Sequence, residues 1–394
     1  MSAAGDTAVA AVASAAELAA EADGSAAAWD SAGRLPVPVR RRMAEAGLFA
    51  PDVAPEYGGA GLGPAELGEA AATLGGVCSA LRGLLTVQGM VAAALARWGT
   101  RAQRADWLPA LTSGALTAGF AATEQGAGSA LGEVGTRIEE SGPGHLTVTG
   151  HKKWITFGED ADVLLVLGTL DGRPATVLVE ADRGGVTREP VRGQLGMRAA
   201  GIAHVTFDRT RVPRDRLVAP PGAGLSHVAA TALDHGRYTV AWGCVGMAEA
   251  CLADAAAHAA SRRQGAERLA DHQLVRSLLA RAAVRTAGAR ELAARAGRSR
   301  APGPGRGVTE TIVAKYAAAE AAADTSRDAV QILGSAGCEP DSRCGRHFRD
   351  AKVMEIIEGA QQVSELHIAE RLLRRHGPGT RPAAPDAADG RRPV

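Results

Sequence analysis

The amino-acid sequence predicts a mostly α-helical protein with a central β domain. Three observations lead to this fold class: apolar residues recur at helical spacing up to about residue 113, alternate as in strands from 116 to 218, and return to helical spacing after 221. Because 394 residues exceed the usual size of one hydrophobic core, we expect several domains. The expected division is an N-terminal α-helical domain at 1–115, a middle β domain at 116–221, a C-terminal helical bundle at 222–375 and a disordered tail at 376–394.

The N-terminal block is predicted to be helical because amphipathic stretches, such as 38–48 and 79–98, alternate with Gly and Pro breaks. In the middle block, β-rich runs at 145–155, 163–170, 175–179 and 203–207 are separated by Gly, Asp and Pro turns. This pattern predicts a small antiparallel β domain.

The last block is predicted to contain long helices at 224–261, 271–296, 308–333 and 355–375, with a loop at 301–307. Helices of this length suit a helix bundle. The stretch from 376, rich in Pro, Gly, Arg and Asp, favours disorder.

Composition excludes several function classes. The 44 basic and 43 acidic residues give a formal charge of +1, so no excess field favours nucleic acid or an anionic membrane. An uninterrupted apolar run and a basic leader segment are both lacking, which predicts a cytoplasmic protein. Five scattered cysteines suit reduced thiols, and the spacing of Cys338 and Cys344 does not match common zinc sites, so we expect no metal.

Several short motifs stand out, although each has a structural explanation when taken alone. PEYGGAGLG at 55–63 fits a turn-rich loop, and QILGSAG at 331–337 fits the glycine end of a helix. ATEQGAGSA at 122–130 could let backbone N–H groups approach a flat ligand. In WIT at 154–156 an indole could cover a ring system, or it could be a core Trp. Arg349 and Asp350 could be only an exposed ion pair.

The joint order of these motifs resembles the acyl-CoA dehydrogenase family from about residue 36 to 375. The landmarks are PEYGG at 55, ATEQGAGS at 122, KKWIT at 152, LGMR at 195, RVP at 211, LDHGR at 233, HQ at 272, QILGSAG at 331 and RDAK followed by IIEG at 349–359. The resemblance implies FAD as cofactor and an N-terminal helical domain, a β-barrel domain and a C-terminal four-helix bundle. It also implies a homodimer or homotetramer.

A narrower resemblance concerns dehydrogenases of acyl carrier protein thioesters that make hydroxymalonyl or methoxymalonyl extender units for polyketides. The stretches that carry it are CSALRGLLTVQGM at 78, VAWGCVG at 240, DHQLV at 271 and AKVMEIIEGA at 351. It implies an acyl carrier protein thioester or an acyl-CoA as substrate, and an electron-accepting partner or oxygen.

By resemblance, Glu358 is the catalytic base that takes a proton while hydride leaves to flavin N5. Its neighbours Ile356 and Ile357 are apolar, which predicts a raised carboxyl pKa through desolvation. Some relatives carry the base just before the arginine of LDHGR, but here that residue is Gly236. A solvated Glu at a helix start is the structural alternative.

The resemblance also assigns binding roles. Thr123 and Thr156 would contact the isoalloxazine ring, Trp154 would cover it, and Ser129 would serve the phosphate or pantetheine side. Five positions would grip the FAD diphosphate and adenosine of a neighbouring subunit: Arg262, Gln273, Gln331, Gly334 and Gly337. Gly265 and Ala266 replace the family's aromatic-glycine pair there, which predicts weaker FAD binding.

Two further sets concern the thioester. Asp234 and Arg237 would lie beside its arm, although Asp234 could instead be a helix N-cap and Arg237 a surface residue. Arg82, Thr86 and Gln88 fall in the helix that lines the acyl end in relatives. Because a polar end disfavours a long fatty chain, we expect a short, oxygen-bearing acyl group.

Three rival interpretations stay open. The nearest is α,β-dehydrogenation of a short-chain acyl-CoA or acyl-carrier thioester by the same residues. A flavin monooxygenase on this fold is the second, and it needs no acid-base Glu. The third is a helical scaffold that has lost flavin, supported only by the changes at Gly265 and Ala266.

Overall fold

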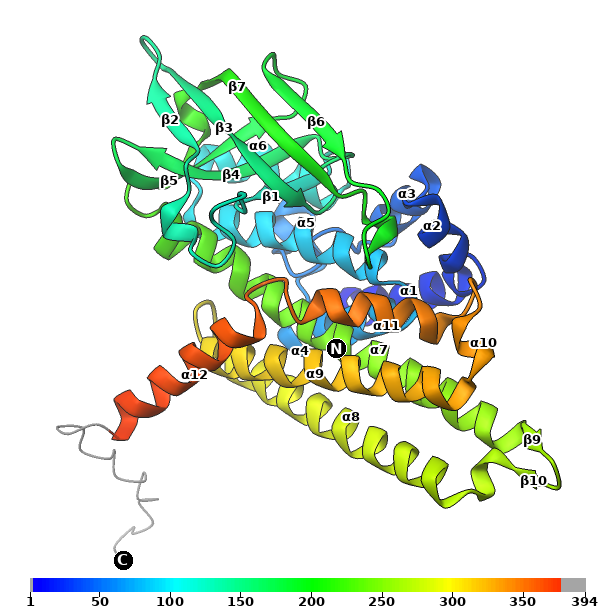
Figure 1. Ribbon diagram of the computed structural model, residues 1–394. Helices are drawn as coiled ribbons and strands as arrows, with labels where there is room; N and C mark the ends of the chain where they lie inside the picture. Colours follow the sequence, from blue (N-terminus) through cyan, green and yellow to red (C-terminus); the bar gives the residue numbers. More distant parts are fainter. Residues whose placement is uncertain (1–2, 377–394) are drawn as a thin grey trace, which may run out of the picture.

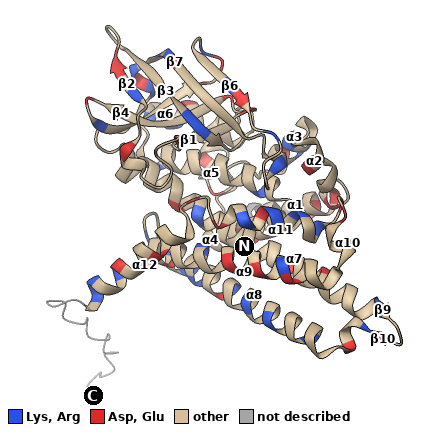
Figure 2. Cartoon of the chain, in the orientation of Figure 1, with Lys and Arg blue, Asp and Glu red and all other residues tan. Residues whose placement is uncertain are grey.

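The computed structural model describes residues 3–376, so the expected tail beyond His376 lies outside the described residues. Figure 1 shows a β domain stacked on helices, with the C-terminal helix α12 projecting to one side and a small hairpin, β9–β10, at the opposite end. Acidic and basic side chains are interspersed over the chain (Figure 2).

The N-terminal block is entirely helical. Its helices are α1 (Ala3–Asp23), α2 (Ala26–Ala32), α3 (Val37–Glu45), α4 (Pro64–Val77), α5 (Ser79–Trp98) and α6 (Arg101–Thr112). Thr100 caps α6 by accepting a hydrogen bond from the N–H of Gln103, which saturates a free N-terminal donor. Helix α5 contacts both strand β1 and helix α7, so it lies between the sheet and the C-terminal bundle.

The middle block forms one eight-stranded sheet. Its strands are β1 (Ala118–Ala121), β2 (Arg137–Glu140), β3 (His145–Ile155), β4 (Val163–Leu170), β5 (Arg173–Glu180), β6 (Val186–Pro190), β7 (Ala203–Pro213) and β8 (Leu217–Val218). The expectation of a purely antiparallel domain was wrong, because β4 pairs in parallel with both β1 and β2. Strand β4 is almost completely buried, as expected of a strand with parallel partners.

The C-terminal block is helical again. It contains α7 (Ala230–Ser261), α8 (Gln273–Arg300), α9 (Val308–Leu333), α10 (Ser335–Cys338), α11 (Arg343–Met354) and α12 (Gln361–His376), and a π-helical turn (Gly224–Ala229) leads into α7. Helix α9 contacts α7, α8, α11 and α12, so it is central to the bundle. The expected loop at 301–307 separates α8 from α9.

Glycines let the central helices approach closely. A Cβ on Gly243 of α7 would lie 2.8 Å from the Arg82 side chain, and one on Gly246 would lie 1.9 Å from the Ala72 carbonyl oxygen. Two helices, Ser79–Trp98 and Gly224–Ser261, are long and apolar enough to cross a membrane, but 89% and 61% of their apolar windows are buried inside the protein. They serve as core helices of this fold.

One expected helix is interrupted. The stretch 355–375 was predicted to be helical throughout, but α11 ends at Met354 and α12 begins only at Gln361. Glu358 and Gly359 between them have φ of +55° and +99°. A left-handed backbone cannot continue a helix, and for Glu358 it costs about 1 kcal/mol.

Candidate active site

The turn between α11 and α12 positions Glu358, the residue expected to be the base. Two cations of neighbouring helices hold this turn through its carbonyl groups. Arg237 of α7 donates to the Glu358 carbonyl at 2.8 Å, and Lys315 of α9 donates to the Gly359 carbonyl at 2.8 Å. These two bonds stabilise the left-handed turn and thereby fix the direction of the Glu358 side chain.

The Glu358 carboxyl group packs against α7 at Gly236. A Cβ at Gly236 would lie 2.7 Å from Oε2 of Glu358 and 3.0 Å from the Met90 sulfur. The carboxyl group therefore occupies the space that any other residue at 236 would fill. Oε2 is buried and has no hydrogen-bond partner within the described part of the chain. An orphaned acceptor of this kind is available to a substrate proton.

Burial raises the pKa of Glu358 to about 7, while Arg237, Lys315, Arg82 and His235 oppose the rise. A carboxyl group with this pKa is suited to general-base work near neutral pH. The predicted direction is confirmed, but the predicted cause was wrong in part. Ile356 is 58% exposed, so the desolvation comes from α5 and α7 rather than from that neighbour.

A buried polar group lies on α5 beside this carboxyl. Arg82 is 2% exposed and donates to Thr86 Oγ1 at 3.4 Å and to the Met354 sulfur at 2.9 Å. Thr86 in turn shares a 2.9 Å hydrogen bond with Thr239 of α7. Among the described residues, no carboxylate forms an ion pair with Arg82. A buried guanidinium without a carboxylate is costly unless a ligand supplies oxygen atoms.

Two expected substrate ligands have other roles. The Gln88 amide donates to the carbonyls of Leu111 and Leu116 and accepts from the N–H of Ala118, so it ties α5 to β1 and has little capacity left for a substrate. Asp234 is not an N-cap, because it lies in the second turn of α7. Its Oδ2 pairs with Arg300 at 2.6 Å, while its buried Oδ1 lacks a partner.

The expected flavin-ring contacts lie together at the end of β3 and the loop after β1. The N–H of Lys153 donates to the Thr123 carbonyl at 2.9 Å, which joins the two segments. Trp154 has φ of +58°, and its indole is 55% exposed and packs edge-on against His204 at 5.5 Å between ring centroids. The Thr156 methyl group lies 4.0 Å from the Cβ position of Gly83, next to Arg82 on α5.

A buried ion pair that the sequence did not indicate fixes this loop. Lys152 is fully buried, donates to the Ala122 carbonyl at 3.0 Å and pairs with Glu124 at 2.7 Å. Burial lowers the pKa of Lys152 to about 8. Glu124 also accepts three hydrogen bonds from Gly135 and Thr136. The loop that contains Thr123 is therefore rigid, whereas Ser129 farther along it is exposed.

The second expected FAD set lies at the hairpin end of the molecule, apart from Glu358 (Figure 1). The side chains of Arg262, Gln273 and Gln331 are exposed there, as is Gly334, while Gly337 is buried against Val330. Gly265 and Ala266 form the turn of the β9–β10 hairpin. The structure does not bring this set to the Glu358 site of the same chain.

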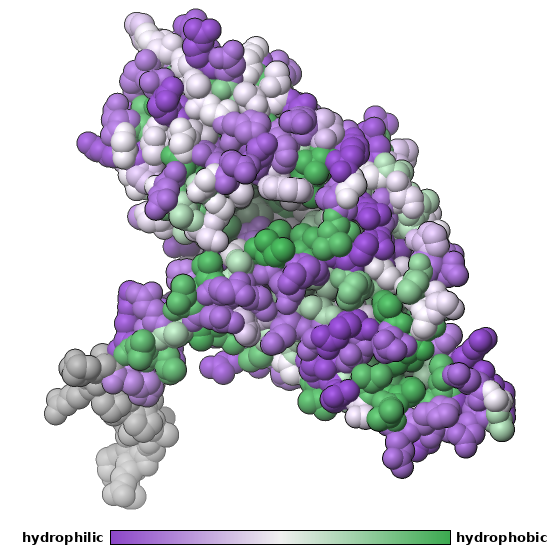
Figure 3. Space-filling view, viewed as in Figure 1, coloured by the Kyte–Doolittle hydropathy of each residue, from purple (hydrophilic) through white to green (hydrophobic). Residues whose placement is uncertain are grey.

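The surface between the β domain and the helices is hollowed, and hydrophobic side chains gather at the edge of the hollow (Figure 3). Trp154, Leu195 and Ile356 are exposed large hydrophobic residues from three different segments. Thr123 and Thr156 add hydroxyl groups at the adjoining strand ends. Apolar cover with a few hydroxyl donors fits the flat ring of a flavin.

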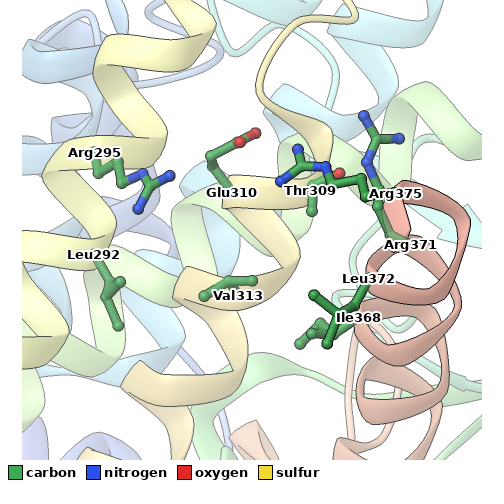
Figure 4. Close-up of a pocket in the computed structure, with 9 residues that line it drawn as sticks. All are labelled: Leu292, Arg295, Thr309, Glu310, Val313, Ile368, Arg371, Leu372 and Arg375. Carbon is green, nitrogen blue, oxygen red and sulfur yellow. The ribbon is translucent and has the colours of Figure 1, made fainter. Parts of the chain in front are cut away.

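Two other cavities lie away from Glu358. One, of about 190 Å³, is lined by α8, α9 and α12, with Arg295, Arg371 and Glu310 above an apolar floor (Figure 4). The other, of about 400 Å³, is bounded by α1, α4 and α7, with Arg290 and Arg343 at its rim. Arg343 pairs with Asp254, and Arg290 pairs with Glu249 and Glu69.

A buried carboxyl group with a raised pKa, near a buried guanidinium and exposed apolar side chains, is compatible with a flavin-dependent dehydrogenase of acyl thioesters. Comparison with known proteins identifies the family. The N-terminal, middle and C-terminal acyl-CoA dehydrogenase domains match residues 6–115, 119–210 and 222–373. The chain therefore belongs to the acyl-CoA dehydrogenase family, whose cofactor is FAD.

Individual relatives agree with this assignment. The chain is 31% identical over 355 residues to the mitochondrial short-chain specific acyl-CoA dehydrogenase of Bos taurus, covering 89% of this chain and 85% of that protein. Butyryl-CoA dehydrogenase from Megasphaera elsdenii superposes with a TM-score of 0.89 at 25% identity, covering 94% and 98%. FkbI, described as serving biosynthesis of the methoxymalonyl extender unit of the polyketide Fk520, has a TM-score of 0.84 at 41% identity and covers 91% and 99%.

Three contributing residues were missed in the sequence: Lys315, Thr239 and Lys152. Lys315 is buried on α9, and the signal for it in the sequence was a single charge in the otherwise uncharged stretch VAKYAAA. The contacts of Thr239 and Lys152 likewise depend on packing between segments that are distant in the sequence, so no local motif indicates them. Arg349 and Asp350 are not an exposed pair, because Arg349 pairs with Asp30 and Asp350 accepts from the N–H of Met197.

Proposed function

We propose that this enzyme oxidises a short, oxygen-bearing acyl group held as a thioester on an acyl carrier protein, at the step that brings a hydroxymalonyl- or methoxymalonyl-type extender unit to the acid level. The observation that carries the proposal is the buried Arg82 guanidinium, which has no carboxylate of its own and lies beside Thr86 and Thr239. The likeness to FkbI at 41% identity supports the pathway.

In this reaction Glu358 takes the hydroxyl proton of the aldehyde hydrate at its unpartnered Oε2. The hydrogen on the same carbon leaves with its electron pair, and the C=O bond of the acid forms. FAD, when bound, supplies the hydride acceptor at N5. An electron-accepting protein or oxygen then removes the two electrons. The Arg82 guanidinium would hold the oxygen atoms of the product, because a planar cation pairs well with a carboxylate.

Other residues position the reactants. Arg237 and Lys315 hold the base turn through its carbonyl groups, while Oδ1 of Asp234 remains free to accept from the thioester arm. Thr123, Trp154 and Thr156 would face the isoalloxazine ring, and Ser129 would lie toward the phosphate or pantetheine side. Arg262, Gln273, Gln331, Gly334 and Gly337 would hold the FAD of a second copy, which makes the homo-oligomer a requirement. A cytoplasmic location fits this role.

The test is anaerobic flavin reduction by matched thioesters on a carrier protein and on CoA. We expect an oxygenated three-carbon thioester on the carrier to bleach the flavin of the wild-type protein. Arg82→Met nearly keeps the side-chain volume but removes the charge. In this variant the kcat/KM for the oxygenated carrier-bound thioester should fall about 100-fold, since a charged hydrogen bond contributes about 1.5–3 kcal/mol. Simple acyl thioesters should be affected much less.

Bleaching by butyryl-CoA alone would instead support α,β-dehydrogenation of a short-chain acyl-CoA, the alternative favoured by the relatives from Bos taurus and Megasphaera elsdenii. In that reaction Glu358 takes the α-proton and the β-hydrogen leaves as hydride. A flavin monooxygenase is less well supported, because its reaction does not need a carboxylate base at the position of Glu358. Oxygen consumption coupled to hydroxylation of the thioester would reverse that judgement.

A further inference from the structure

The end of strand β3 contains a residue in a strained backbone conformation. Trp154 has φ of +58°, a value that bulky side chains adopt rarely. Such an outlier persists only where the surrounding structure imposes it, and outliers of this kind gather at functional sites. Trp154 is 55% exposed, so burial of the indole in a core does not impose the conformation. Another contact must hold it.

The pairing of β3 with β7 shows why the backbone departs from a strand at this point. Between Lys152 and Ile155, two residues of β3 lie opposite the single residue His204 of β7. This arrangement is a β-bulge, which interrupts the ladder of hydrogen bonds and redirects a side chain of the longer strand. Trp154 lies within the bulge, and bulges of this kind are frequent beside active sites.

The His204 side chain occupies the position opposite the bulge and contacts Trp154 twice. The backbone N–H of Trp154 donates to Nδ1 of His204 at 3.2 Å, and the two rings meet edge-on at 5.5 Å between centroids. Because a backbone amide can only donate, Nδ1 is the unprotonated nitrogen of the imidazole, and neutral His204 has its proton on Nε2. One side chain therefore contacts both the strained backbone and the indole.

Titratable groups from two neighbouring strands face the imidazole. On β3 they are Lys153 and His151, whose ring centroid lies 6.2 Å from that of His204. On β6 the cross-strand neighbour is Glu189. Burial and the charge of Lys153 lower the pKa of His204 from its ordinary value of 6.5, against the opposing effect of Glu189. The imidazole is thus neutral at neutral pH, as an acceptor at Nδ1 must be.

We infer that His204 is a positioning residue, which accepts the N–H of Trp154 and thereby directs the indole toward the place of the flavin ring. The inference rests on the proposed function in one respect, namely that Trp154 covers this ring. The bulge lies at the edge of the site, because the methyl group of Thr156, two residues further on, is 4.0 Å from the Cβ position of Gly83 on α5. A change in the bulge therefore reaches the site directly.

The test compares two substitutions of His204 in the FAD-loaded protein. His204→Leu removes the acceptor, whereas in His204→Asn the amide oxygen takes the position of Nδ1 and keeps it. Hydrogen exchange over residues 152–156, followed by mass spectrometry, reports the N–H of Trp154. Exchange of this amide should be about 2–10-fold faster in His204→Leu, the loss expected for one neutral hydrogen bond. In His204→Asn it should equal that of the wild type.

Fluorescence of the bound FAD reports where the indole lies, because an indole packed against an isoalloxazine ring quenches its emission. The emission should rise in His204→Leu toward the level of Trp154→Phe and stay low in His204→Asn. In the wild type it should also rise as the pH falls well below 6.5, since a proton on Nδ1 removes the acceptor. His204→Asn should show no such rise.

The matched control is His145→Leu at the other end of β3, about 30 Å away along the strand, which should leave both measurements unchanged. The inference is overturned by wild-type FAD emission in a folded His204→Leu protein, and equally by a His204→Asn protein that behaves like His204→Leu. If His204→Leu does not fold, the pH profiles of the wild type and His204→Asn give the decision, and identical profiles overturn the inference.

The test separates this inference from the proposed function. Neither measurement uses a thioester, so a wild-type protein whose flavin no carrier-bound thioester reduces would refute the proposed reaction and leave the role of His204 standing. Unchanged FAD emission in Trp154→Phe would instead remove the indole from the flavin ring, and the inference about His204 would be overturned with it.

Discussion

The two ends of the C-terminal bundle differ in how complete they are. At the Glu358 end the functional groups are buried and held by the same chain, as the bonds from Arg237 and Lys315 to the base turn show. At the hairpin end, Arg262, Gln273 and Gln331 are exposed and surround no site within the chain. Under the proposed function, the contrast means that one chain supplies the groups for proton abstraction, whereas retention of the cofactor would need a second copy. Substitutions at the two ends should therefore have separable effects.

The largest effect is expected at the base itself. If Glu358 accepts the substrate proton as proposed, Glu358→Gln should slow flavin reduction by about 10²–10⁴-fold, the usual contribution of a general base. Stopped-flow absorbance measures this rate. Glu355→Gln, which changes a neighbouring residue that pairs with Lys352, is the matched control and should react normally. A normal rate in Glu358→Gln with bound FAD would remove the base assignment.

A smaller loss is expected when the carboxyl group is displaced rather than removed. In Gly236→Ala the new methyl group would meet Glu358 Oε2 at 2.7 Å, so the carboxyl group must move and the rate should fall about 10–100-fold, as misplacement of a reacting group by about 1 Å does. The control is Gly288→Ala on α8, where a Cβ meets nothing within 4 Å. It should be fully active and more stable by about 1 kcal/mol. Equal rates in the two variants would show that the base tolerates a shift.

At the hairpin end the change should affect binding and leave the chemistry intact. Arg262→Ala should weaken FAD binding about tenfold, because one charged hydrogen bond to phosphate contributes about 1.5–3 kcal/mol. Flavin reduction at saturating FAD should be unchanged, and dilution should release FAD together with dissociation of the oligomer. Arg209→Ala, on an exposed side chain of β7, is the control. Unaltered FAD affinity in Arg262→Ala would remove this end from the cofactor site.

The sequence predicted the helical and β blocks well, because their periodicities are local properties. The motifs IIEG and LDHGR also pointed to Glu358 and Gly236, which the structure brings together, while the role of Glu358 as base stays a prediction. The turn that positions Glu358 was missed, because Glu355, Ile356 and Ile357 all favour or tolerate a helix, whereas bonds from α7 and α9 help to hold the left-handed backbone. Local preference is overridden there by tertiary contacts.

The same limit explains the errors around the substrate. Gln88 was expected to face the acyl group because it falls in the helix that lines the acyl end in relatives, but its amide is used by three backbone groups of residues 111–118. Thr239 was missed because its partner Thr86 lies 153 positions away in the sequence. Such pairings depend on how closely the helices approach each other. Glycines of α7 allow this approach, and their positions follow no recognisable sequence motif.

The last prediction concerns stability, where the burial of Glu358 should appear as a dependence of the free energy of unfolding on pH. Its pKa is raised to about 7 in the folded protein, above an ordinary value of 4.5, so the fold favours the protonated form. The native state then binds more protons than the unfolded state between these pH values, and the free energy of unfolding falls as pH rises through this window. A glutamine at 358 is neutral throughout and escapes this loss.

Thermal unfolding of wild type and Glu358→Gln, at fixed protein and saturating FAD, should therefore give similar Tm values near pH 5. Toward pH 8 the variant should become the more stable one by on the order of 2 kcal/mol, since each pKa unit corresponds to about 1.4 kcal/mol. For the hairpin-end variant Arg262→Ala, the difference in unfolding free energy from wild type should not change with pH in this way. A pH-independent difference for Glu358→Gln would mean that the carboxyl group is solvated in the folded protein, and the contrast between the two ends would then lose its physical basis.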